Sequence, residues 1–170
     1  MSTYHFNEHR HRYAVWTAAR AVQRNFRVTN GAVRKAIDSA ELRSFAECEN
    51  EYSHAEFKIF HITCATKMMD CFIQSGIPNV SYGRVAKIIA IYLKTSVVLC
   101  SKATCPQSQV IHPPVDRILL QNLSKKVLGL EQLAEINWTR LNSEEYWKLA
   151  ELIRERTGLF DWQLEEFWDT

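Results

Sequence analysis

Hydrophobic residues recur at helical spacing over most of this chain, and the clearest stretch runs from 81 to 93. Ser81 is a good N-cap, and the apolar residues after it fall at i, i+3, i+4, i+7 and i+8. Those residues are Val85, Ile88, Ile89, Tyr92 and Leu93. Positions 86, 90 and 91 are also apolar, and a helix that is apolar on nearly all sides is expected at the centre of a fold. We therefore expect an all-α protein organised around this helix.

The same periodicity, together with capping residues, predicts helices along the rest of the chain. We expect them over residues 7–23, 30–40, 42–48, 53–73, 130–136, 143–156 and 159–168. The second of these has Thr29 or Asn30 as its cap, and the sixth has Asn142 or Ser143. With 170 residues and 46% hydrophobic content, the chain is long enough for one real core, so we expect a single domain, residues 1–170.

One lysine and one aspartate stand out against this apolar background. Lys87 lies in the early turns of the apolar helix, where a solvated residue is least expected. The prolines of the segment 112–115 hold the chain extended, so the next helix begins at about Asp116, which is its expected N-cap. The buried face of that helix is expected from Ile118, Leu119, Leu120 and Leu123. A lysine facing a fixed carboxylate in an apolar setting suits covalent amine chemistry, once the amine has lost its proton.

These two stretches, AKIIAIYL and PPVDRILL, resemble the helix-hairpin-helix DNA glycosylases. The likeness is greatest to the 8-oxoguanine branch, including archaeal members with a long lysine-to-aspartate spacing. In that family the lysine attacks the sugar C1′ as the base leaves, and the aspartate stabilises the positive sugar. The resemblance implies that Lys87 is the nucleophile and Asp116 the assisting carboxylate. Lys94 is the alternative nucleophile, because it is nearer to Asp116 in the sequence.

The resemblance also implies a compact helical domain that binds double-stranded DNA containing a modified base. The family's hairpin carries two closely spaced glycines after Leu-Pro, whereas residues 77–83 here read IPNVSYG and keep one glycine. A helix N-terminus near Ser81 can still donate N–H groups to a phosphate. We expect the DNA backbone to be contacted by Ser81, Gly83, Arg84, Lys94 and Arg117.

Aromatic and polar residues at both ends of the chain are candidates for contact with the base. Trp16, Arg20 and Gln23 lie near one face of the first helix, where an indole can stack on a base while Arg or Gln reads its edge. The alternative is a packed tryptophan with a solvated Arg and Gln. In the last segment, Trp162 or Trp168 either caps the core or walls the base pocket.

Charge is distributed unevenly along the chain. The net charge is +2 overall, but residues 81–126 carry seven basic residues against one acid, and residues 131–170 carry ten acids against four basic residues. A basic sector around the proposed site suits docking onto a phosphate backbone. The alternative is ordinary surface charge that happens to cluster.

Metal, cofactor and membrane functions are not expected. The five cysteines are an odd count without a secretory signal, which indicates free thiols. Cys100, Cys105 and His112 do not match the spacing or ligand number of structural zinc sites, and His61 is expected to be a core histidine rather than a catalytic base. No apolar run reaches membrane-spanning length, so we expect a cytoplasmic monomer without metal or cofactor.

The sequence therefore predicts a DNA glycosylase that flips out and excises a modified base and leaves an abasic site. The substrate is either an oxidised purine in DNA repair or a hypermodified phage base in antiviral defence. Both hydrolysis and lyase activity by β-elimination stay open. The alternative hypothesis is a protein without catalytic activity, a helical DNA-binding or regulatory module. In it Lys87 contacts phosphate and Asp116 only caps its helix.

Overall fold

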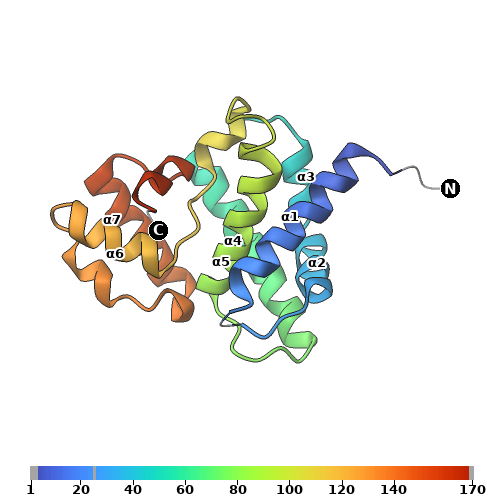
Figure 1. The fold of residues 1–170 in the computed structure, drawn as a ribbon, viewed down its shortest axis with the longest axis horizontal. Coiled ribbons are helices and arrows are strands. Elements are labelled where there is room, and N and C mark those ends of the chain that lie inside the picture. Colours follow the sequence, from blue (N-terminus) through green and yellow to red (C-terminus); the bar gives the residue numbers. More distant parts are fainter. Residues whose placement is uncertain (1–3, 25, 169–170) are drawn as a thin grey trace.

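Helix α5 (Tyr82–Leu93) lies at the centre of the computed structural model (Figure 1). The model describes residues 4–24 and 26–168, and within those ranges every regular element is a helix. All residues of α5 are buried except Arg84 and Lys87, as its apolar pattern predicted. The prediction of an all-α fold is confirmed.

Three helices from the first half of the chain, α1 (Phe6–Val22), α2 (Asn30–Ser39) and α3 (Leu42–Glu47), lie on one side of α5. The fourth, α4 (His54–Gln74), passes behind α5 and reaches α7 (Ser143–Thr157) through contacts such as that of Lys58 with Glu151. Helix α1 packs against α5, and its residues Ala14, Ala18 and Ala19 are fully buried. These helices begin and end within a residue or two of the positions expected from the sequence.

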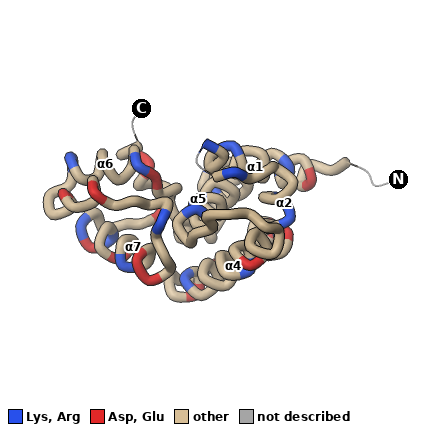
Figure 2. Tube along the Cα trace, turned by 90° about the horizontal axis from the view of Figure 1, so that it is seen from below, with Lys and Arg blue, Asp and Glu red and all other residues tan. Residues whose placement is uncertain are grey.

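The second half of the chain lies on the other side of α5, as Figures 1 and 2 show. It consists of α6 (Arg117–Lys126), η3 (Glu131–Glu135), η4 (Trp138–Arg140), α7 (Ser143–Thr157) and η5 (Trp162–Phe167). Between the two halves, α5 continues into a π-helical turn, η1 (Lys94–Val98), which is followed by the short 3-10 helix η2 (Pro106–Val110). The expected short helices near 130–136 and 159–168 are 3-10 turns, a form found mostly in short pieces.

Side-chain caps fix the helix starts. Thr29 accepts a hydrogen bond from the Ala32 amide, and Asn142 forms a capping box with Glu145, which settles two choices that the sequence left open. Gly158 ends α7 at a φ of +83°, a left-handed conformation that glycine adopts without a Cβ clash.

Two histidines are buried in the aromatic core beneath α5. Trp147 donates to the Tyr82 hydroxyl, which in turn hydrogen-bonds His61 Nδ1 at 2.8 Å, while His112 Nδ1 pairs with the Tyr146 hydroxyl at 2.9 Å. Burial lowers the pKa of His61 to about 3 and lowers that of His112 well below its usual value. Both are neutral core residues at pH 7, and the described part of the chain contains no cluster of three or more His, Cys, Asp or Glu arranged to hold a metal.

No helix in the described ranges is both long and apolar enough to cross a membrane.

Candidate active site

The structure brings Lys87 and Asp116 together. Lys87 Nζ lies 3.1 Å from Asp116 Oδ2, although the two residues are 29 positions apart. The side chains are 11% and 12% exposed, so the pair is partly screened from water but still reachable. The expected juxtaposition of a lysine on the apolar helix with an aspartate at the next helix start is therefore present.

Asp116 is held in place by two groups besides Lys87, the Leu119 amide and the Trp168 indole. Its Oδ1 accepts the Leu119 amide at 3.0 Å, the bond of an N-cap. The indole N–H of Trp168 lies 3.3 Å from Oδ1 and 3.2 Å from Oδ2. The start of a helix also stabilises negative charge. These contacts orient the carboxylate toward Lys87 and bring Trp168 to the site, although Trp168 is not among the residues that line the cavity beside Lys87.

The side chain of Lys87 also lies over the ring of Trp138. The Lys87 Nζ lies 4.8 Å from the centroid of the Trp138 ring, within the range of a cation–π contact. Element η4 carries Trp138 and is fastened to the start of α5 by two hydrogen bonds, from the Gly83 amide to the Leu141 carbonyl at 3.0 Å and from Ser81 Oγ to the Thr139 carbonyl at 2.7 Å.

Glycine at position 83 allows the backbone of η4 to lie directly against the start of α5. A Cβ at Gly83 would stand 1.9 Å from the Trp138 carbonyl oxygen, a distance that no side chain tolerates. The role of Trp138 was missed from the sequence. A lone glycine at the start of an apolar helix is the one available signal of a close backbone contact, but it does not name the partner.

Lys87 and Asp116 border an open cavity of about 370 Å³ between the end of α1 and the start of α6. Its lining consists of Ala21, Val22, Arg24, Lys87, Asp116, Arg117, Ile118 and Trp138. The prediction that Ile118 belongs to the buried face of α6 is wrong: it is 38% exposed, because the Asp116 cap turns Leu119, Leu120 and Leu123 toward the core and leaves Ile118 facing the cavity. The volume falls within the usual range of ligand pockets, about 300–1,000 Å³.

The rival lysine has a different partner. Lys94 Nζ lies 2.6 Å from Glu165 Oε2, and both residues line a larger cavity of about 750 Å³ together with Trp162. Glu165 thus pairs with Lys94 beside the larger cavity, while Trp168, three residues further on, contacts Asp116. Of the two candidate nucleophiles, Lys87 is the one that contacts the carboxylate.

Arg84 and Arg117 line a third cavity of about 590 Å³ beside Trp138. Burial, with a smaller effect from Arg140, lowers the pKa of Arg84 from its usual value. Arg117 also lines the Lys87 cavity, so these arginines form a basic border next to it. Figure 2 shows basic residues on both flanks of the gap between α1 and α6. Arg24, which belongs to this border, was missed, although a run of basic residues from 20 to 27 is visible in the sequence.

Two expected phosphate contacts are engaged inside the protein. Gly83 is buried and its amide is donated to Leu141, while Ser81 Oγ bonds Thr139 and accepts the Arg84 amide. Lys94, another expected contact, is paired with Glu165, while Arg84 and Arg117 line the cavity beside Trp138.

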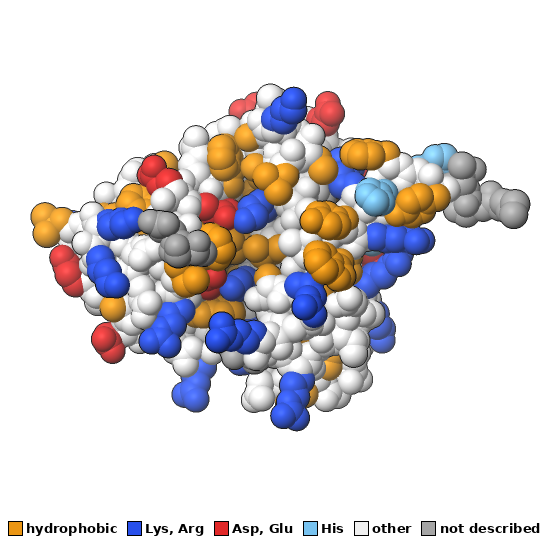
Figure 3. Space-filling model, in the orientation of Figure 1, with side chains coloured by type: hydrophobic (Ala, Val, Ile, Leu, Met, Phe, Trp, Pro, Cys, Tyr) orange, Lys and Arg blue, Asp and Glu red, His pale blue; other side chains and the backbone are white. Residues whose placement is uncertain are grey.

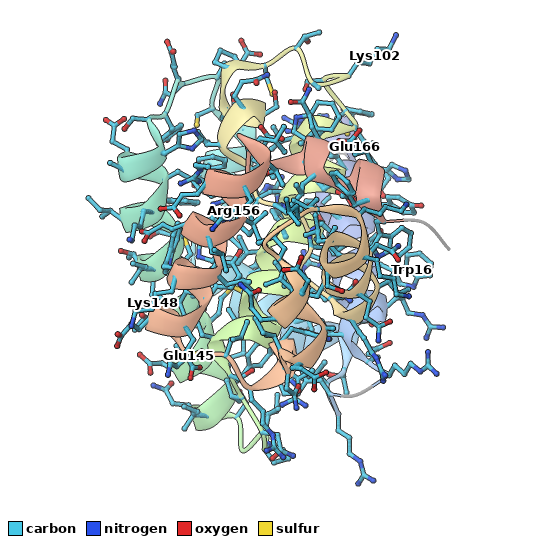
Figure 4. The ribbon with its side chains drawn as sticks, turned by 90° about the vertical axis from the view of Figure 1, so that its left-hand side faces the viewer. Trp16, Lys102, Glu145, Lys148, Arg156 and Glu166 are labelled. Carbon is cyan, nitrogen blue, oxygen red and sulfur yellow. The ribbon has the colours of Figure 1, made fainter. Side chains whose placement is uncertain are left out.

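The expected group on α1 does not line the Lys87 cavity. Trp16 and Arg20 are exposed on the outer side of the helix, and Figure 4 shows Trp16 on the side of the molecule opposite Lys148. Gln23 Nε2 donates to the Val28 carbonyl at 3.1 Å and to Asn30 Oδ1 at 3.0 Å, so it stabilises the turn after α1. These residues do not form a wall of the pocket beside Lys87.

A scan against models of protein families, a search of curated proteins and a search of solved structures each found no match to this chain.

Proposed function

We propose that this chain is a DNA glycosylase of the helix-hairpin-helix type that acts on double-stranded DNA containing a modified base. One observation carries the proposal: an amine and a carboxylate 3.1 Å apart border an open cavity whose rim includes Arg24 and Arg117. Glycosyl transfer to an amine needs a nucleophile and a fixed negative charge beside it, while the rim supplies cations for DNA phosphates. We expect a cytoplasmic protein that acts as a monomer.

The chemistry follows from the positions of the two side chains. After a nucleotide is extruded from the duplex, Lys87 as a free amine attacks C1′ of the sugar. A bond forms between Nζ and C1′, the glycosidic bond breaks, and its electron pair leaves with the base, which takes up a proton. Asp116, as a carboxylate, offsets the positive charge that develops on the sugar while the glycosidic bond breaks, and afterwards accepts the proton that the Lys87 nitrogen loses. Trp138 positions the Lys87 amine, and Trp168 positions the Asp116 carboxylate.

The closed-ring aminal at C1′ then opens: the C1′–O4′ bond breaks, O4′ takes up the proton held by Asp116, and a Schiff base forms between Nζ and C1′. Two outcomes follow from this Schiff base. Water attack releases Lys87 and leaves an abasic site, whereas β-elimination cuts the strand on its 3′ side. Both stay open, as do both substrates, an oxidised purine in repair and a hypermodified phage base in antiviral defence.

A noncatalytic DNA-binding module is the second candidate, and the ion pair itself favours it. Lys87 and Asp116 satisfy one another, and Asp116 also caps α6, so the pair has a structural role without any chemistry. In that case the basic rim would bind phosphate and no bond would be broken.

The deciding experiment is mass spectrometry of bases released from a panel of duplexes: unmodified, oxidised, alkylated, deaminated and phage-hypermodified. Release of one base, lost in Lys87→Gln and Asp116→Asn but kept in Lys94→Gln, supports the glycosylase and names its substrate. Lys94→Gln is the matched control. It also removes a lysine that is paired with a carboxylate, and Lys94 directly follows α5 but lines a different cavity from Lys87.

Borohydride trapping of a protein–DNA adduct then tests whether the amine itself attacks. An adduct that forms with the wild type and with Lys94→Gln but not with Lys87→Gln assigns the nucleophile. No release across the panel, with DNA binding intact, would favour the binding module instead.

A further inference from the structure

Two aromatic rings are stacked on the outer side of α1, away from the Lys87 cavity. The ring centroids of Tyr13 and Trp16 are 5.8 Å apart with planes inclined by 25°, and the residues are 56% and 48% exposed. Hydrophobic side chains gather over α1 on the face shown in Figure 3. Large aromatic side chains gain free energy when they are buried, so two stacked rings that stay exposed indicate a surface that binds a partner.

Most charges around this pair are basic, although Arg12 Nε also pairs with Glu8 Oε1 at 2.7 Å. Arg12 precedes Trp16 by four residues and Arg20 follows it by four, so they lie on the same side of the helix, about 12 Å apart along its axis. Between residues 4 and 28 the sequence has five arginines and a single acid, Glu8. Arg24, one turn beyond Arg20, lines the Lys87 cavity, so the basic stripe continues to the candidate site.

We propose that Tyr13 and Trp16 form a stacking platform for unpaired bases of a DNA strand, with Arg12 and Arg20 contacting its phosphates. An aromatic face flanked by cations is the arrangement that binds single strands, because every base has a π face and every linkage a negative charge. The faces of bases inside a duplex are covered by their neighbours, so the platform selects DNA that has been opened. It deepens the proposed function by supplying a place for strand that is unpaired while a nucleotide is extruded.

The test measures binding and needs no catalysis. In a Lys87→Gln background, fluorescence anisotropy compares an oligothymidine with an abasic oligomer of the same length, which carries the phosphates without the bases. Trp16→Leu should weaken binding to oligothymidine by about 5- to 150-fold, the range for loss of one stacked base, and leave binding to the abasic oligomer unchanged. Trp16→Phe, which retains a ring, should restore most of the affinity.

The control is Ile59→Ala, which removes an exposed apolar side chain from α4 and should affect neither oligomer. Equal losses on both oligomers, or no loss on either, would overturn the proposal. If Tyr13 and Trp16 instead join two copies of the chain, sedimentation will show a concentration-dependent dimer that Trp16→Leu abolishes, which also overturns it. Because the assay records binding alone, its failure is distinguishable from a failure of base release.

Discussion

Replacing Gly83 by alanine introduces a methyl group into the contact that places Trp138 over Lys87. The new Cβ would lie 1.9 Å from the Trp138 carbonyl oxygen, where ordinary contacts begin at 3.4 Å, so η4 must retreat by about 1.5 Å. The retreat stretches two hydrogen bonds, from the Gly83 amide to Leu141 and from Ser81 to Thr139.

The expected loss in free energy of unfolding follows from these terms. Overpacking of this kind costs about 1–3 kcal/mol, and each weakened hydrogen bond about 0.5–1.5 kcal/mol. Alanine returns up to about 1 kcal/mol through its better helix propensity. The net loss is therefore about 3 kcal/mol. Base release should also slow, because Trp138 no longer holds Lys87 in position.

Urea unfolding followed by far-UV circular dichroism measures the effect. Gly31→Ala is the matched control: Gly31 lies in the first turn of α2, and a Cβ there would meet Thr29 Oγ1 at 3.8 Å, an ordinary contact. That variant should be unchanged or more stable by up to about 1 kcal/mol. If the two alanine variants unfold at the same urea concentration, the assigned role of Gly83 is refuted.

Three further outcomes are expected. Trp168→Phe removes the indole N–H from the proposed catalytic carboxylate and should slow single-turnover base release by about tenfold with little change in Tm; an unchanged rate would show that the contact is incidental. The pKa of His61 falls from 6.5 to about 3 on folding, so the unfolded chain binds more protons between those values. The contribution of His61 to stability should therefore be full above pH 6.5 and decline as pH falls toward 3, by up to about 1.4 kcal/mol per pH unit, and His112, whose pKa is also lowered, adds a decline in the same direction; urea titrations should show a shallower decline in His61→Phe. Arg24→Gln and Arg117→Gln should each lower the slope of log Kd against log salt for duplex DNA by about 1, whereas Lys148→Gln, whose lysine pairs with Glu144, should leave it unchanged.

The local elements of this fold were predictable because their causes lie within a few residues. The buried face of α5 follows from apolar spacing, and the start of α6 follows from two prolines and the Asp116 cap. For α2 and α7 the sequence left two neighbouring residues as candidate N-caps. The structure identifies Thr29 and Asn142, whose side chains accept the amide three residues further on. The pairing of Lys87 with Asp116 was expected from the motif resemblance rather than from spacing alone.

Contacts between distant segments were decided by the tertiary structure. Nothing near Lys87 in the sequence indicates that Trp138 covers it, and nothing near Lys94 indicates that its partner is Glu165. The role of Gln23 in a turn and the exposure of Ile118 likewise depend on which surfaces meet. The physical reason is range: caps and helical periodicity act within about four residues, whereas the partners of a charged side chain depend on how whole helices pack around α5.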